Sequence, residues 1–209
     1  MVWALGFKDG MGVTHSLLEM DGDLDKIEYV DGPADWGTVA GGFEAGDLNM
    51  GRALKPEYVP TKFLWGGPKN RKLPDVIYGR GVVLVSSRVK DIMEWFEPGV
   101  HQYFPVDIIY KSSKEFAEKM FFLNICTRLD SIDRKLTTAT LSKGGMWKPE
   151  TGYWVFDLAA IGSHHFWHDK HIFLGWMVSD ALKQAFEEGG IKGFAYNLRK
   201  DNGGDHHRV

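Results

Sequence analysis

The stretch from Lys72 to Ile108 constrains the fold more than any other part of the chain. It predicts short strands over 75–78 and 82–85, separated by a glycine-containing turn. Ser86 or Ser87 is expected to begin a helix, because a serine oxygen can accept from the free N–H groups of a first helical turn. The apolar residues that follow recur at helical spacing and define the face that this helix buries: Val89, Ile92, Met93, Phe96 and Val100.

A Pro-Gly pair ends this helix, and a third strand is predicted over 102–109. A later segment repeats the same order: a strand over 172–176, a helix over 180–188, a glycine stop and a last strand over 194–198. Two interpretations stay open. Capping and amphipathicity alone give any strand–helix–strand unit this pattern, or the two units are quasi-equivalent halves of one sheet.

Both interpretations predict the α+β class: a mixed, mostly antiparallel sheet with two main capped amphipathic helices and a loop-rich N-terminal region. We expect residues 1–70 to form strands and loops packed on a main α+β domain, 71–198, followed by a flexible tail, 199–209. Other strands are predicted over 2–7, 16–20, 121–126, 136–141 and 153–158.

Composition narrows the function classes. The chain has 209 residues, enough for a sizeable core, and its net charge of −3 gives no argument for a nucleic-acid partner. Cys126 is the single cysteine, so no internal disulfide can form. The first residues lack a basic region followed by a long apolar one, and no run approaches a membrane span. We therefore expect a cytoplasmic protein with no membrane contact.

Several blocks, in order, resemble one family of bacterial immunity proteins. The residues that carry the resemblance are 72–75 (KLPD), 85–90 (VSSRVK), 97–106 (EPGVHQYFPV), 123–134 (LNICTRLDSIDR), 178–183 (VSDALK) and 190–194 (GIKGF). This is the eleventh catalogued immunity family, formerly a domain of unknown function and later assigned to polymorphic toxin systems. The resemblance covers residues 60–200 and is much weaker over 1–60.

The resemblance implies a protein that binds and neutralises a cognate secreted toxin by occluding its active site, without a cofactor or catalysis of its own. The toxin would be encoded by the adjacent upstream gene. Oligomeric state stays open. Two alternatives remain: a metal-dependent enzyme that uses the His164–His171 cluster, and a binding module with an unrelated protein partner.

Carboxylates crowd the segment between Glu19 and Asp35, with Lys26 as the single base. A calcium loop beginning at Asp21 would need Gly at its sixth position and Glu at its twelfth, and these are Lys26 and Gly32. The segment is either a solvated turn or a surface that steers toward the basic cleft of a nucleic-acid-cutting toxin. Because this region resembles the family least, we predict that it binds the toxin, through Asp21, Asp23, Asp25, Glu28, Asp31, Asp35 and Trp36, with Trp147 as a further anchor.

The histidines, the cysteine and a charged block after it can each be explained by a structural role. His164, His165, His168 and His171 favour a strand–turn–strand with Asp169 and Lys170 at its tip, and no nearby Cys or Glu completes a zinc site. Cys126 and His101 form the one cysteine–histidine pairing that two matching blocks offer, but apolar neighbours favour an inert thiol. The charged residues Arg128, Asp130, Asp133 and Arg134 form either a salt-bridged turn or the rim of the binding face.

Overall fold

The structure is a computed structural model that describes residues 1–8, 17–31, 51–69, 72–79, 81–172 and 175–203. Strands within these ranges form two six-stranded sheets and one two-stranded sheet. Sheet I has the order β2 (Leu17–Met20), β3 (Lys62–Trp65), β6 (Gln102–Tyr110), β7 (Phe116–Asn124), β5 (Val82–Val85), β4 (Val76–Gly79). Sheet II has the order β11 (Val155–Phe156), β14 (Phe194–Asp201), β1 (Val2–Phe7), β13 (Trp176–Ser179), β12 (Phe166–Asp169), β8 (Arg128–Leu129).

The remaining elements are short or helical. The small sheet pairs β9 (Thr140–Leu141) with β10 (Trp147–Lys148). The α-helices are α1 (Ser87–Phe96), α2 (Leu158–Ile161) and α3 (Asp180–Glu188), and two 3-10 turns cover Leu24–Lys26 and Pro149–Thr151. Most strand pairs are antiparallel, with β3–β6, β8–β12 and β11–β14 as parallel pairs. The predicted α+β class, with its mostly antiparallel sheets, is confirmed.

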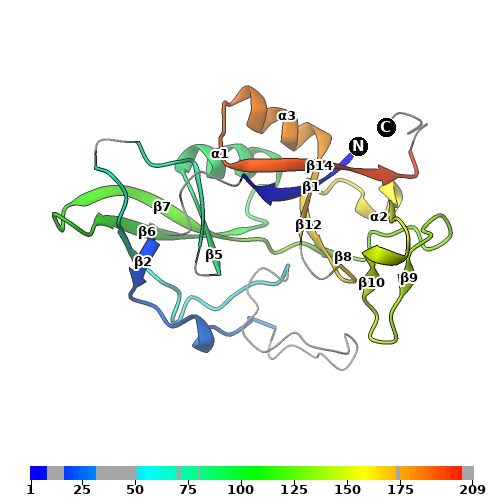
Figure 1. Ribbon diagram of the computed structural model, residues 1–209, viewed down its shortest axis with the longest axis horizontal. Helices are drawn as coiled ribbons and strands as arrows, with labels where there is room; N and C mark the ends of the chain where they lie inside the picture. Colours follow the sequence, from blue (N-terminus) through cyan, green and yellow to red (C-terminus); the bar gives the residue numbers. More distant parts are fainter. Residues whose placement is uncertain (9–16, 32–50, 70–71, 80, 173–174, 204–209) are drawn as a thin grey trace.

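The two repeated segments are split β–α–β units in different sheets. In sheet I, β5 and β6 flank β7, which is antiparallel to both. In sheet II, β13 and β14 flank β1 in the same way. The interpretation as halves of one sheet is therefore wrong. The likeness is real in three dimensions, because each unit places its helix over its own sheet, and Figure 1 shows α1 and α3 side by side.

The two helices begin as predicted, but their serines act differently. Ser179 accepts a hydrogen bond from the Leu182 N–H, 3.1 Å away, as an N-cap should. Ser86 occupies the N-cap position of α1 without such a bond, and its hydroxyl instead donates to the Asp75 carboxylate at 2.9 Å. That bond ties the start of α1 to the chain just before β4.

Strand alternation distributes the apolar side chains over three clusters. In β5, Val83 and Val85 face one cluster, whereas Val82 and Leu84 face another. The same alternation divides sheet II, so both faces of each sheet are buried in part. The middle cluster combines residues of both sheets with Val89 and other residues of α1 and α3, and it joins the two halves of the molecule.

Several predicted boundaries shift. The strand expected over 121–126 begins earlier, at Phe116, and those over 136–141 and 153–158 shrink to two residues each. Strand β1 lies between β14 and β13, inside sheet II, and β14 continues to Asp201, three residues into the expected tail. Within the described ranges, no helix is both long and apolar enough to cross a membrane.

Candidate functional site

The described part of the acidic segment is bound to residues 52–62. Tyr29 forms an isolated antiparallel bridge with Leu54, flanked by the backbone hydrogen bonds Val30 N to Ala53 O and Lys55 N to Glu28 O. Its start is held by Asp21, whose carboxylate accepts bonds from both N–H groups at 61 and 62, at 2.7 and 3.0 Å. The segment is therefore an ordered edge of the molecule over its described residues.

Most of its described carboxylates have cationic or hydrogen-bonding partners. Three form ion pairs: Asp23 with Lys26 at 2.9 Å, Glu28 with Lys55 at 2.5 Å, and Asp31 with Arg52 at 2.6 Å. Partial burial raises the pKa of Asp21, but the hydrogen bonds that it accepts outweigh that effect and lower it below its usual value. Asp25 is exposed and forms no ion pair with any described residue. The local field is thus weaker than the count of carboxylates suggests.

The predicted tryptophan anchors have different outcomes. Asp35 and Trp36 lie outside the described residues. Trp147 is only 9% exposed and packs in the cluster on the outer face of sheet II with Phe156 and Trp167. Its indole is therefore not available as a surface anchor, and its expected role in binding is corrected to a core role. For a tryptophan in a glycine-rich loop, the sequence does not show whether the side chain will be buried against a sheet.

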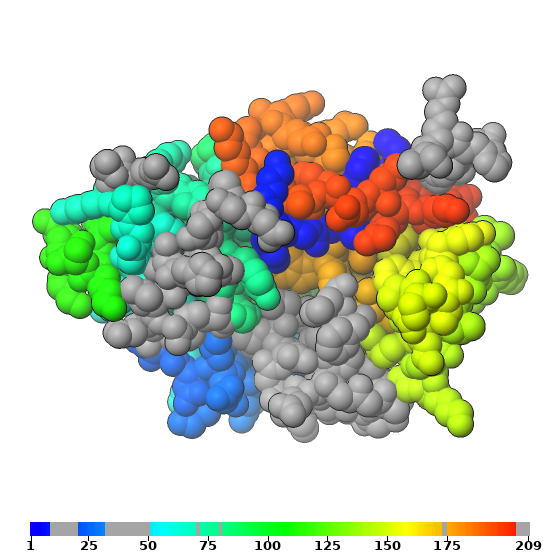
Figure 2. All heavy atoms as spheres, in the orientation of Figure 1, coloured from blue at the N-terminus to red at the C-terminus, as the bar shows by residue number. Residues whose placement is uncertain are grey.

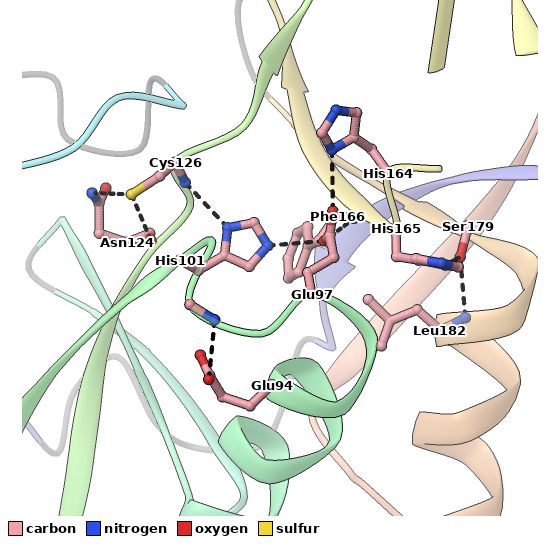
Figure 3. A network of polar contacts seen from close by, with 11 residues as sticks. Glu94, Glu97, His101, Asn124, Cys126, His164, His165, Phe166, Ser179 and Leu182 are labelled. Atoms are coloured by element: carbon pink, nitrogen blue, oxygen red, sulfur yellow. Dashed lines mark hydrogen bonds and ion pairs between the residues drawn. The ribbon is translucent and has the colours of Figure 1, made fainter. Parts of the chain in front are cut away.

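A buried carboxylate joins the two sheets (Figure 3). Glu97, directly after α1, is 6% exposed and accepts a hydrogen bond from the Phe166 N–H of β12 at 2.9 Å. The same carboxylate contacts His101 Nε2 at 3.0 Å and His164 Nδ1 at 3.3 Å. Although burial raises the pKa of Glu97, hydrogen bonds from His101 and the backbone lower it overall, so the group stays ionised.

The geometry assigns the tautomer of His101. Its Nδ1 accepts from the backbone N–H of Cys126 at 3.3 Å, so the ring proton lies on Nε2 and is donated to Glu97. His101 thus contacts the cysteine's backbone and not its thiol. The thiol lies near the oxygens of Gln102 and Asn124, and burial raises its pKa to about 11. A protonated thiol is a poor nucleophile, so this pairing is built for packing and not for attack.

The four clustered histidines contact different partners. His164 meets Glu97, and His165 Nδ1 lies 2.8 Å from a serine hydroxyl. His171 Nδ1 lies 2.7 Å from a backbone carbonyl oxygen, and His168 is buried with a pKa lowered to about 4 by desolvation and a nearby arginine. No group of three or more His, Cys, Asp or Glu side chains among the described residues is arranged to hold a metal ion. The cluster in sequence is not a cluster in space.

The charged residues of the block after β7 bond to one another and to two more distant side chains, His171 and Asn202. Arg134 forms an ion pair with Asp130, four positions earlier in the sequence, at 3.0 Å. Asp133 accepts from the N–H groups of residues 135 and 136 and from the Asn202 side chain. These contacts fit the interpretation as a salt-bridged turn.

The structure shows a groove that the sequence did not reveal. It has a volume of about 340 Å³ and lies where β14 meets the turn before β11. Its lining includes Pro149, Tyr153, Trp154, Leu198, Arg199 and Lys200. In the sequence, the signal for this groove was two pairs of adjacent residues, Tyr153-Trp154 and Arg199-Lys200. These pairs are far apart in the chain, and only the parallel pairing of β11 with β14 brings them together.

Comparison with known proteins gives one family. A model of the immunity protein family Imm11 matches residues 30–201, from the acidic segment to the last residue of β14. The matched range contains α1, α3 and the whole Glu97 network. No curated protein matches the chain.

Proposed function

We propose, from the premise that the chain belongs to the Imm11 immunity protein family, that it binds one cognate toxin and neutralises it by occluding the toxin's active site. The family match over 30–201 is the observation that carries this proposal. The toxin is a secreted protein encoded by the adjacent upstream gene, and the complex forms in the cytoplasm of the cell that makes both.

The internal chemistry supports binding over catalysis. The groups most able to react, Glu97, His101 and Cys126, bond to one another's side chains or backbone inside the molecule. An enzyme would need such groups to face a substrate. Here they connect sheet I to sheet II, so their role is to hold the scaffold that presents a binding surface.

Part of that surface is the acidic segment with Asp35 and Trp36. Asp25, exposed and without an ionic partner among the described residues, is its clearest source of attraction for a basic partner. Trp36 is the proposed anchor, and Trp36→Ala is expected to weaken toxin binding chiefly through faster dissociation, with an unchanged melting temperature. A large drop in melting temperature would assign Trp36 to the core instead.

Co-expression tests the function itself. The toxin encoded upstream is expected to stop growth of a host cell, and this chain to restore growth and to co-purify with the toxin. An inert upstream product, or a toxin whose activity is unchanged by a molar excess of this protein, would overturn the proposal. Directing the chain out of the cytoplasm with an added export signal should abolish protection.

A further inference from the structure

We propose that the groove between β14 and the turn before β11 binds an acidic segment of the toxin. This inference rests on the proposed function and adds a second contact surface to it. Figure 2 shows the red end of β14 next to the yellow segment around β11 and α2. The groove lies between β14 and residues 149–154. Tyr153 is 46% exposed and Leu198 is 40% exposed, which leaves large apolar surface for a partner to cover.

The charge in the groove is unbalanced. Its lining contains two cations, Arg199 and Lys200, and no carboxylate. Neither cation forms an ion pair with a described residue. Instead, Lys200 Nζ lies 3.8 Å from the centre of the Tyr153 ring, and the Arg199 guanidinium lies 5.9 Å from that of Trp154. By contrast, Lys26, Arg52 and Lys55 are each paired with a carboxylate of the acidic segment.

Two hydrogen-bond donors of the lining residues are also without a partner in the described part of the chain. Arg199 Nε and Trp154 Nε1 are buried and have no hydrogen-bond partner among the described residues. Two cations beside the exposed Tyr153 ring and the half-buried Trp154 ring form an amphipathic site, which a carboxylate next to an apolar side chain would complement. A carboxylate next to an apolar side chain is a combination that a protein loop can present.

A nucleic acid fits less well. Phosphate-tracking proteins engage many phosphates with an extended basic surface, and this groove offers two cations on a chain of net charge −3. The groove therefore selects an acidic loop of a protein. Its position at the edge of sheet II lets such a loop reach it without displacing a strand.

The test measures binding of the toxin domain encoded by the upstream gene to Lys200→Glu and Tyr153→Ala by titration calorimetry. The matched control is Lys192→Glu, which makes the same charge change at an exposed position between α3 and β14. Each groove variant is expected to raise the dissociation constant at least about tenfold, and the control less than about twofold, at unchanged melting temperatures. Affinity of the wild type should fall with salt, and that of Lys200→Glu should fall less steeply.

The outcomes separate the two proposals. Groove variants that bind the toxin as tightly as wild type would overturn the groove as the site while leaving the immunity function standing. Wild-type protein that fails to bind the toxin would overturn both. Toxin binding that is unchanged in Lys200→Glu, with loss of binding to a single-stranded oligonucleotide, would assign the groove to nucleic acid and overturn the protein partner.

Discussion

The carboxylate of Glu97 accepts a hydrogen bond from the backbone N–H of Phe166, 2.9 Å away and 69 positions later in the chain. Glu97 follows α1, whose preceding strand is in sheet I, and Phe166 begins β12 of sheet II. The bond lies at the edge of the apolar cluster that both sheets share. For the Glu97 carboxylate and the Phe166 N–H, this bond takes the place of hydrogen bonds to water. Both groups are buried where the two halves of the molecule meet.

Removing this carboxylate should destabilise the whole protein. Glu97→Ala leaves the Phe166 N–H and the His101 Nε2–H without acceptors, at an expected cost of about 3 kcal/mol in the free energy of unfolding. Glu97→Gln keeps one acceptor oxygen and should cost less. Urea denaturation measures both, with the exposed Glu188→Gln as the control expected within about 0.5 kcal/mol of wild type. A Glu97→Ala protein as stable as wild type would show that the bond contributes nothing.

Acid should weaken the fold through His168. Burial, with a contribution from Arg128, lowers its pKa in the folded state to about 4 from the ordinary 6.5. Between these values the unfolded chain binds a proton that the folded chain does not, so stability falls as pH drops from 6.5 toward 4. The full loss is at most about 3 kcal/mol.

His168→Gln removes this titration, so its unfolding free energy should depend less on pH than that of wild type. The comparison is sharpest from pH 6.5 to 5, because the carboxylates with lowered pKa values, such as Glu97, lose their stabilising effect only at lower pH. Parallel pH dependences for the two proteins would mean that His168 titrates normally in the fold.

Truncation should lower the stability strongly at one tryptophan and hardly at all at another. Trp147, 9% exposed, packs in a core cluster, and Trp147→Ala is expected to cost about 4 kcal/mol. Trp95, on α1, is 78% exposed, and Trp95→Ala should change stability by less than about 0.5 kcal/mol. Thermal melts compare them directly. Equal melting temperatures for the two variants would contradict the burial of Trp147.

The acidic segment should separate into structural and steering residues. Asp21→Asn weakens the bonds to residues 61 and 62 and is expected to cost about 1 kcal/mol of stability. Asp25→Asn should leave stability unchanged while slowing toxin association and flattening its salt dependence. Stopped-flow association kinetics alongside melting curves distinguish these effects. An association rate unaffected by Asp25→Asn at low salt would remove this segment from the steering surface.

The sequence by itself determined the local units of this protein. The serine before each amphipathic run, the glycines after it and the alternating apolar residues of 82–85 specify strands and helices through short-range capping and side-chain periodicity. These signals involve neighbours within a few residues, so they placed the starts of α1 and α3 correctly. The family resemblance identified the immunity family from blocks within the same region, as the match over 30–201 shows.

Only the tertiary structure decided how these units combine. No local sequence signal predicts that β1 lies between β13 and β14. Nor does one predict that Ser86 donates to Asp75 while Ser179 caps its helix. The histidine cluster and the buried Trp147 were uncertain for the same reason: spacing shows which side chains are close in sequence, but partners many residues away set their exposure and bonds. The groove beside β14 needed two segments more than 40 residues apart in the chain, which long-range strand pairing alone brings together.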